Sequence, residues 1–167
     1  MEMAVLFITI SNSIMKENIA KSGAAIFNGG ILTMTASTVT NHASEEGGGA
    51  IVNNNTATLN TSTFTENYGK NGGVIYNIGT LSSSGSTYTI NESTFGGAIL
   101  NEGILTVGSK TVFSDNTAYV GGALFNTGKA SITSANFSNN RVNRTAQITN
   151  SGFGGAIYDI GASSTIT

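Results

Sequence analysis

The strongest constraint in this sequence is a six-residue motif that returns at a nearly constant interval. Each copy opens with Gly, in most cases a Gly-Gly pair, and ends with Asn or Asp. The copies occupy residues 23–28, 48–53, 72–77, 96–101, 121–126 and 154–159. Their starts are 25, 24, 24, 25 and 33 residues apart. A fixed period of this size is typical of solenoids and other stacked repeats.

A second marker falls between the glycine motifs and keeps the same period. It is an apolar residue followed three positions later by Asn, as in Phe64 with Asn67 and Phe113 with Asn116. Val39 with His42 fills the same place in its unit. His42 is therefore interpreted as a variant of a stacked Asn column. A metal site would need further ligands, and the chain has one His and no Cys.

A third column follows the glycine motif and predicts where each unit turns. Its members are Gly30, Asn55, Gly79, Gly103, Gly128 and Gly161. Gly and Asn are the residues that most readily adopt a positive φ, so we expect a left-handed backbone here. Apolar residues alternate beyond the turn, as at Leu32 and Met34, which is the period of a strand.

Short strands, tight turns and a period near 24 predict an all-β fold, a right-handed parallel β-helix. We expect 24 to 25 residues per coil, as the motif spacing has it, and roughly six to seven coils. Residues 1–167 would form a single β-helix domain, a segment of a longer protein. The early apolar run at residues 3–8 then fits a strand of an incomplete first coil.

Composition narrows the classes of function. Only 10% of the residues are charged, the net charge is −2, and no basic cluster appears, so we expect no nucleic-acid partner. No apolar run approaches the length of a membrane-spanning helix, so we expect no direct membrane insertion of this segment. No cofactor motif appears, and we expect neither a metal nor a cofactor.

The parity of the glycine motif separates a core column from a surface column. The aliphatic residue and the final Asn share one face, so we expect the Asn side chains to form an inward ladder of stacked amides. The predicted ladder comprises Asn28, Asn53, Asn77, Asn101 and Asn126. The residue between them would face outward, and its aromatic members are candidate contact residues: Phe27, Tyr76, Phe125 and Tyr158. A reversed parity or a covering loop would bury this column.

One interruption of the period is a candidate for specificity. Phe137 lies 17 residues before the next glycine pair, where the other units have 8 or 9. The extra residues, 141–149, predict an inserted loop, and insertions in solenoids gather on one face. Arg141 and Arg144, the two arginines of the chain, lie here and are candidate binding residues. A surface insertion without a function is the alternative.

Recurring GGA[ILV] and FxxN tetrapeptides resemble those of the chlamydial polymorphic outer membrane proteins and adhesin-like β-helix proteins. Residues 48–51, 96–99, 121–124 and 154–157 carry the first tetrapeptide, and Phe64, Phe113 and Phe137 begin the second. The resemblance implies an autotransporter-type passenger at the cell surface, outer membrane or outside the cell. It further implies adhesion to a host-cell or surface receptor or glycan.

Three alternatives stay open at this point. Some parallel β-helices degrade polysaccharides as lyases or glycoside hydrolases, but that chemistry needs clustered carboxylates, and the nine acids here are dispersed. Ice binding is a second, because a column of small hydroxyl residues recurs at Thr33, Thr58, Ser82, Thr106 and Ser131. End-to-end self-association is the third, since open ends of a solenoid leave strand edges unpaired.

Overall fold

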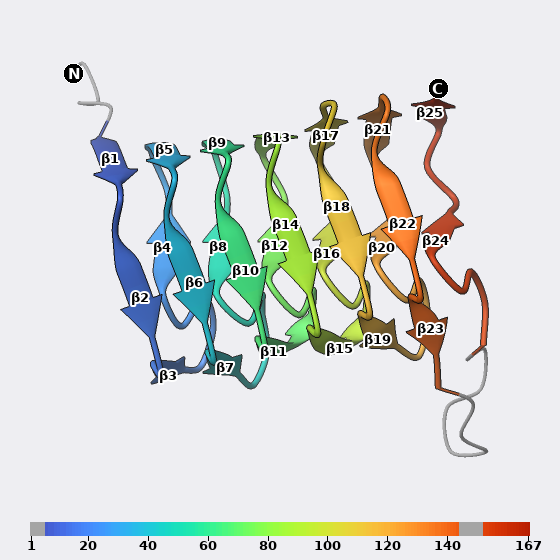
Figure 1. The fold of residues 1–167 in the computed structure, drawn as a ribbon, viewed down its shortest axis with the longest axis horizontal. Coiled ribbons are helices and arrows are strands. Elements are labelled where there is room, and N and C mark those ends of the chain that lie inside the picture. Colours follow the sequence, from blue (N-terminus) through green and yellow to red (C-terminus); the bar gives the residue numbers. More distant parts are fainter. Residues whose placement is uncertain (1–5, 144–151) are drawn as a thin grey trace.

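The computed structural model describes residues 6–143 and 152–167, and it confirms the all-β parallel β-helix. The described chain contains 25 strands and no helix, arranged in four parallel sheets, A to D. Each coil contributes one strand to each sheet in turn, and successive coils stack along the long axis of a rod (Figure 1). Within these residues no helix is present that could cross a membrane.

The strands of each sheet lie in the same order in space as in the chain. Sheet A contains β1 (Phe7–Ser11), β5 (Ile31–Thr35), β9 (Thr56–Asn60), β13 (Thr80–Ser84), β17 (Ile104–Val107), β21 (Lys129–Ile132) and β25 (Ser163–Ile166). Sheet B contains β2 (Ile14–Lys16), β6 (Thr38–Thr40), β10 (Thr63–Thr65), β14 (Thr87–Thr89), β18 (Val112–Ser114) and β22 (Asn136–Ser138). Sheet C contains β3 (Ile19–Ala20), β7 (Ala43–Ser44), β11 (Tyr68–Asn71), β15 (Glu92–Phe95), β19 (Thr117–Ala118) and β23 (Arg141–Val142). Sheet D contains β4 (Ile26–Asn28), β8 (Ile51–Asn53), β12 (Ile75–Asn77), β16 (Ile99–Asn101), β20 (Leu124–Asn126) and β24 (Ile157–Asp159).

Equivalent residues of successive coils pair directly, so each repeating position becomes a column along the rod. In sheet B, Phe64 pairs with Tyr88, which in turn pairs with Phe113. The rings of these residues and of Phe137 stack with centroids 4.7 to 4.8 Å apart and planes within 8°. The strand spacing of a β-sheet is close to the thickness of such a stack, so one residue type fits at every coil. The FxxN marker is therefore a core column.

The glycine column that follows sheet D was predicted to have positive φ, and that prediction is wrong. Positive φ is absent at Gly79 and Gly103, although other glycines of the described chain, such as Gly96, have it. These residues are glycine because the backbones of adjacent coils nearly touch. A Cβ on Gly103 would collide with the carbonyl oxygen of Gly79, and one on Gly79 with that of Asn55. Close stacking and positive φ both select glycine, so sequence alone does not separate them.

Left-handed backbone occurs instead at the residue just before the second Asn column. This position has φ between 54° and 58° at Glu17, Asn41, Glu66, Ile90, Asp115 and Asn139. Asn and Asp tolerate this conformation well, whereas a β-branched residue is strained in it. Ile90 is thus the outlier of the column, and 57% of its surface is exposed. Each coil makes its bend between sheets B and C here.

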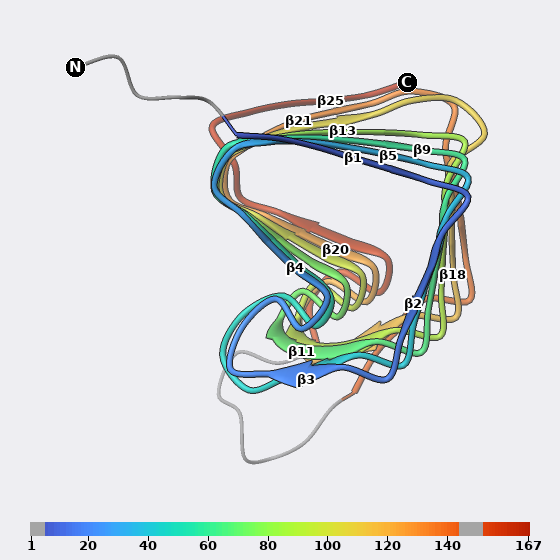
Figure 2. The ribbon, with the colours of Figure 1, turned by 90° about the vertical axis from the view of Figure 1, so that its left-hand side faces the viewer.

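The chain does not run straight from sheet C to sheet D. Viewed along the rod, it hooks back on itself between β3 or β11 and the strands of sheet D (Figure 2). The hook brings its own residues against the outer side of sheet D, where the ring of Phe95 lies 5.8 Å from that of Phe125. The outer side of sheet D is therefore packed in part against residues that precede it in the hook.

Candidate functional site

The three-residue strands of sheet D present one residue outward between two that face the core. In β12, Ile75 and Asn77 are buried, while Tyr76 is partly exposed. The outward residues of the six strands pair in register and form what we call the outer column: Phe27, Val52, Tyr76, Leu100, Phe125 and Tyr158.

The outer column is not a continuous exposed stripe. Phe27 is exposed, and Tyr76, Phe125 and Tyr158 are partly exposed. Val52 and Leu100 are buried, with exposed fractions of only 3% and 5%. Both are aliphatic and alternate along the column with larger aromatic neighbours, which project further from the sheet. The exposed part of the column is therefore interrupted at Val52 and Leu100, and only Phe125 and Tyr158 are adjacent aromatic members.

Four aromatic rings gather at the C-terminal end of this face, and we call them the aromatic cluster: Phe95, Phe125, Phe153 and Tyr158. Phe125 contacts Phe95 and Tyr158, with ring centroids 5.8 and 5.2 Å apart. Phe153 stacks on Tyr158 at 5.8 Å and is 47% exposed. Tilted and offset ring pairs of this kind are favourable packing. The sequence prediction missed Phe95 and Phe153, although both stand immediately before a glycine pair.

The interruption of the period adjoins the aromatic cluster. The inserted segment begins around β23 (Arg141–Val142), and Phe153 follows it. The structure describes the chain again from Gly152 onward. Arg141 is exposed, and its Nε donates a hydrogen bond to Thr117 Oγ1 at 3.2 Å. Arg144 and residues up to 151 lie outside the described residues. The C-terminal members of the aromatic column, Phe125 and Tyr158, thus lie at the same end of the rod as the start of the insertion.

Tyr76 connects the outer column to the turn that follows sheet D. Its hydroxyl donates a hydrogen bond to the carboxylate of Glu102, one coil further on, at 2.8 Å. Burial and the neighbouring Glu102 raise the pKa of Tyr76 to about 12. The phenol therefore stays protonated at physiological pH, and it holds one oxygen of the Glu102 carboxylate beside the column.

Inside the rod, the final residues of the glycine motifs form a hydrogen-bonded ladder. The Nδ2 group of each Asn donates to Oδ1 of the equivalent residue in the next coil, at 2.7, 2.7, 2.6 and 2.6 Å for Asn28, Asn53, Asn77 and Asn101. Asn126 donates in the same way to Asp159 at 2.8 Å. A carboxylate only accepts, so the line of donors ends at Asp159.

Asp159 accepts more than one hydrogen bond. Its Oδ1 receives the Asn126 amide, the Gly161 N–H and the Ser164 hydroxyl. Burial alone would raise the pKa of Asp159, but these donors outweigh it and hold the pKa below its ordinary value. The residue stabilises the end of a ladder and belongs to the architecture of the coil.

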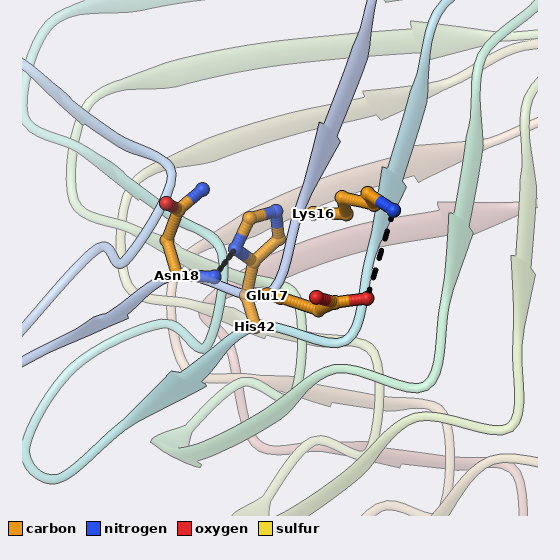
Figure 3. Close-up of polar contacts among 4 residues, drawn as sticks. All are labelled: Lys16, Glu17, Asn18 and His42. Carbon is orange, nitrogen blue, oxygen red and sulfur yellow. Dashed lines mark hydrogen bonds and ion pairs between the residues drawn. The ribbon is translucent and has the colours of Figure 1, made fainter.

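His42 occupies a place in the second Asn column, the one that follows sheet B (Figure 3). The Nδ1 atom of His42 accepts a hydrogen bond from the Asn18 N–H at 3.2 Å, and the His42 N–H donates to Asn67 Oδ1 at 3.1 Å. The proton of the neutral ring must then sit on Nε2, which is buried and has no partner in the described part of the chain. Burial lowers the pKa of His42, against the opposing effect of the Met15 and Asn18 backbone.

Acidic groups remain dispersed over the described residues. Glu46 forms an ion pair with Lys21 at 3.3 Å, and Glu17 forms one with Lys16 at 3.8 Å. Within residues 6–143 and 152–167 there is no group of three or more His, Cys, Asp or Glu side chains that could hold a metal ion.

Small hydroxyl residues form a column on the outer face of sheet A. Thr33, Thr58, Ser82, Thr106 and Ser131 pair in register there. The neighbouring outward column is mixed, with Thr35 beside Asn60 and then Ser84. This face therefore has one regular line of hydroxyl groups, but the mixed column beside it makes the face as a whole chemically uneven.

Two segments of the chain match the family model of the Chlamydia polymorphic membrane protein repeat, residues 110–127 and 134–159. Each segment contains one FxxN marker and one glycine motif. The resemblance inferred from these motifs is confirmed for both segments. No curated protein and no solved structure matches the chain significantly.

Proposed function

We propose that this chain is part of a surface-exposed, secreted or autotransported rod that attaches to a protein or glycan on a host cell or another surface. The match to a membrane-protein repeat family supports a place at the cell surface. The β-solenoid supports a structural and adhesive role, because such rods present long faces for contact. In this proposal the outer side of sheet D carries the contact.

One observation carries the assignment of the contact face. The aromatic cluster is partly exposed, lies outside the hydrophobic core and adjoins the interruption of the period. Aromatic residues are enriched among the residues that dominate binding energy at interfaces. Core packing that repeats in every coil explains why sheet B carries a buried Phe column. The same packing does not require aromatic residues on the outside at Phe153 and Tyr158.

Attachment of the labelled 167-residue chain to cultured epithelial cells tests the proposal. The double variant Phe153→Ser/Tyr158→Ser should lose most of the cell-associated signal. Tyr68→Ser is the matched control, because Tyr68 is an exposed aromatic residue on β11 of sheet C and is not a member of the cluster. Circular dichroism establishes that each variant is folded. Full attachment by the double variant, or equal losses in both proteins, would contradict the assignment.

A further inference from the structure

The corner between sheets D and A contains an open hollow of about 350 Å³. It lies at the level of the last three described coils, on the sheet A side of the turns. Its lining residues are Glu102, Gly103, Ile104, Thr127, Gly128, Lys129 and Ala162. The volume is at the small end of the range of ligand pockets, so the hollow has room for one small ligand group.

A one-residue insertion in the turn of the last coil adjoins the hollow. Asn126 pairs with Asp159, and Lys129 pairs with Ser163. Lys129 is three residues after Asn126, whereas Ser163 is four residues after Asp159, so the last coil has one additional residue here. The preceding coils match step for step, since Asn101 pairs with Asn126 and Ile104 with Lys129. The additional residue falls in the turn that contains Ala162, which lines the hollow. A departure from the repeat at a hollow is where a function is expected.

The lining combines an apolar wall with two separate polar groups. Ile104 is 48% exposed, and it contributes apolar surface together with Ala162. Glu102 holds its carboxylate beside the hollow through the hydrogen bond from Tyr76. The ion pairs of the described chain are Lys16 with Glu17 and Lys21 with Glu46, so Lys129 is not paired with a carboxylate there.

Most backbone donors around the hollow are already used within the rod. The N–H groups of Gly103 and Gly128 donate to the carbonyls of Asn77 and Asn101, and that of Lys129 donates to Gly103. An extended peptide binds to a sheet mainly through free main-chain groups. Recognition at this corner therefore depends mainly on side chains. The charged and apolar side chains of the lining favour a ligand that carries many hydroxyl groups and one apolar face.

We propose that the hollow binds one uncharged pyranose unit of a glycan. The C–H face of the sugar ring lies on Ile104 and Ala162, its hydroxyl groups donate to the Glu102 carboxylate, and a further hydroxyl oxygen accepts from the Lys129 ammonium. Hydrogen bonds to charged groups are the stronger kind, so this pair fixes the ring's orientation. The inference rests on the proposed function, since it names a ligand class for the proposed attachment.

Saturation-transfer NMR on the whole 167-residue chain tests the site with free glucose, galactose, mannose and N-acetylglucosamine. At least one should receive saturation at its ring protons, with a Kd that rises tenfold or more in Glu102→Gln and in Lys129→Met. Tyr76→Phe should weaken the same sugar about threefold. Glu66→Gln and Lys110→Met are the controls, because both residues are exposed charges elsewhere on the rod, and their Kd values should equal that of the parent.

Deletion of Ala162 provides a geometric test that leaves both charges in place. It restores a three-step turn like those of the preceding coils, so the chain should fold and bind no hexose. Absence of transfer to every sugar, or transfer unchanged by Glu102→Gln, would overturn the inference. Cell attachment separates the two proposals. If Glu102→Gln still attaches while Phe153→Ser/Tyr158→Ser does not, the attachment role stands without a sugar contribution from the hollow.

Discussion

The amide of Asn126 donates a 2.8 Å hydrogen bond to the carboxylate of Asp159, and this contact ends a ladder of stacked amides that begins at Asn28. Because every amide donates toward the C-terminal end of the rod, their dipoles point in one direction. The negative charge of Asp159 lies at the positive end of that line. The arrangement parallels a carboxylate at the N-terminus of a helix.

Protonation of Asp159 should therefore weaken the rod in acid. Its pKa is lowered in the folded chain, so its contribution is present above the ordinary pKa of 3.8 and is lost as the pH falls through the folded-state value. Urea unfolding at pH 7 and below pH 4 checks this, with Asp159→Asn for comparison. The parent should lose more stability than the variant on acidification. A difference between the two proteins that does not vary with pH would contradict this account.

Replacement of His42 by Asn should stabilise the rod. An amide can keep the contact with the Asn18 N–H and can also donate to Asn67, whereas the ring leaves its buried Nε2–H unpaired. We expect a gain of about 1 kcal/mol in the free energy of unfolding, measured in urea at pH 7.5. Asn91→His is the reverse control at an equivalent place, and it should lose a similar amount.

The same substitution should remove a pH dependence. The pKa of His42 is lowered from 6.5, so the folded chain binds this proton less readily than the unfolded chain. Stability should then fall as the pH decreases below about 6.5, down to the folded-state pKa. In His42→Asn this decline should be smaller between pH 7.5 and pH 5. Equal declines in the two proteins would exclude His42 as their source.

Ile90 is the residue whose exchange should relieve backbone strain. It has a φ of 56°, and its side chain is mostly exposed, so little apolar burial is lost on replacement. Ile90→Asn should stabilise the chain by about 1 kcal/mol, which is the scale of the left-handed penalty for an ordinary residue. Thermal melting measures the gain. Ile78→Asn, at an exposed position without positive φ, should give none, and a similar gain there would refute the strain argument.

Close stacking of coils predicts opposite outcomes for two glycines. A Cβ at Gly79 would collide with the backbone of Asn55, whereas one at Gly29 would meet no atom within 4 Å. Gly79→Ala should cost about 2 to 3 kcal/mol, as overpacking does, and Gly29→Ala should stay within about 0.5 kcal/mol of the parent. Denaturant unfolding compares the two. A harmless Gly79→Ala would mean that the coils are further apart than described.

The sequence was sufficient for the fold because the repeat places equal residues in equal columns. Phe64, Tyr88 and Phe113 could be assigned to one column from spacing alone, and the structure stacks them. The glycine at position 79 was misread, because a tight approach between backbones and a positive φ require the same residue. The period carries no information that separates these two causes.

The candidate site was harder to predict, because it depends on contacts that cross the columns. Phe95 reaches Phe125 only because the chain hooks back between sheets C and D, and the length of a turn does not reveal its direction (Figure 2). The burial of Val52 and Leu100 follows from the size of their neighbours in other coils. The hollow near Ala162 adjoins a one-residue insertion that follows the last copy of the glycine motif, so the spacing of the copies does not reveal it.

Photo-crosslinking tests the central claim most directly, because it reports which face of the rod touches a surface. A benzophenone amino acid would replace Tyr158 in one sample of the chain and Tyr68 in another, and both would be irradiated on epithelial cells. The proposed function predicts crosslinks to cell-surface molecules from position 158 and few from position 68. Equal crosslinking from both positions, or crosslinking from position 68 alone, would contradict attachment through the outer side of sheet D.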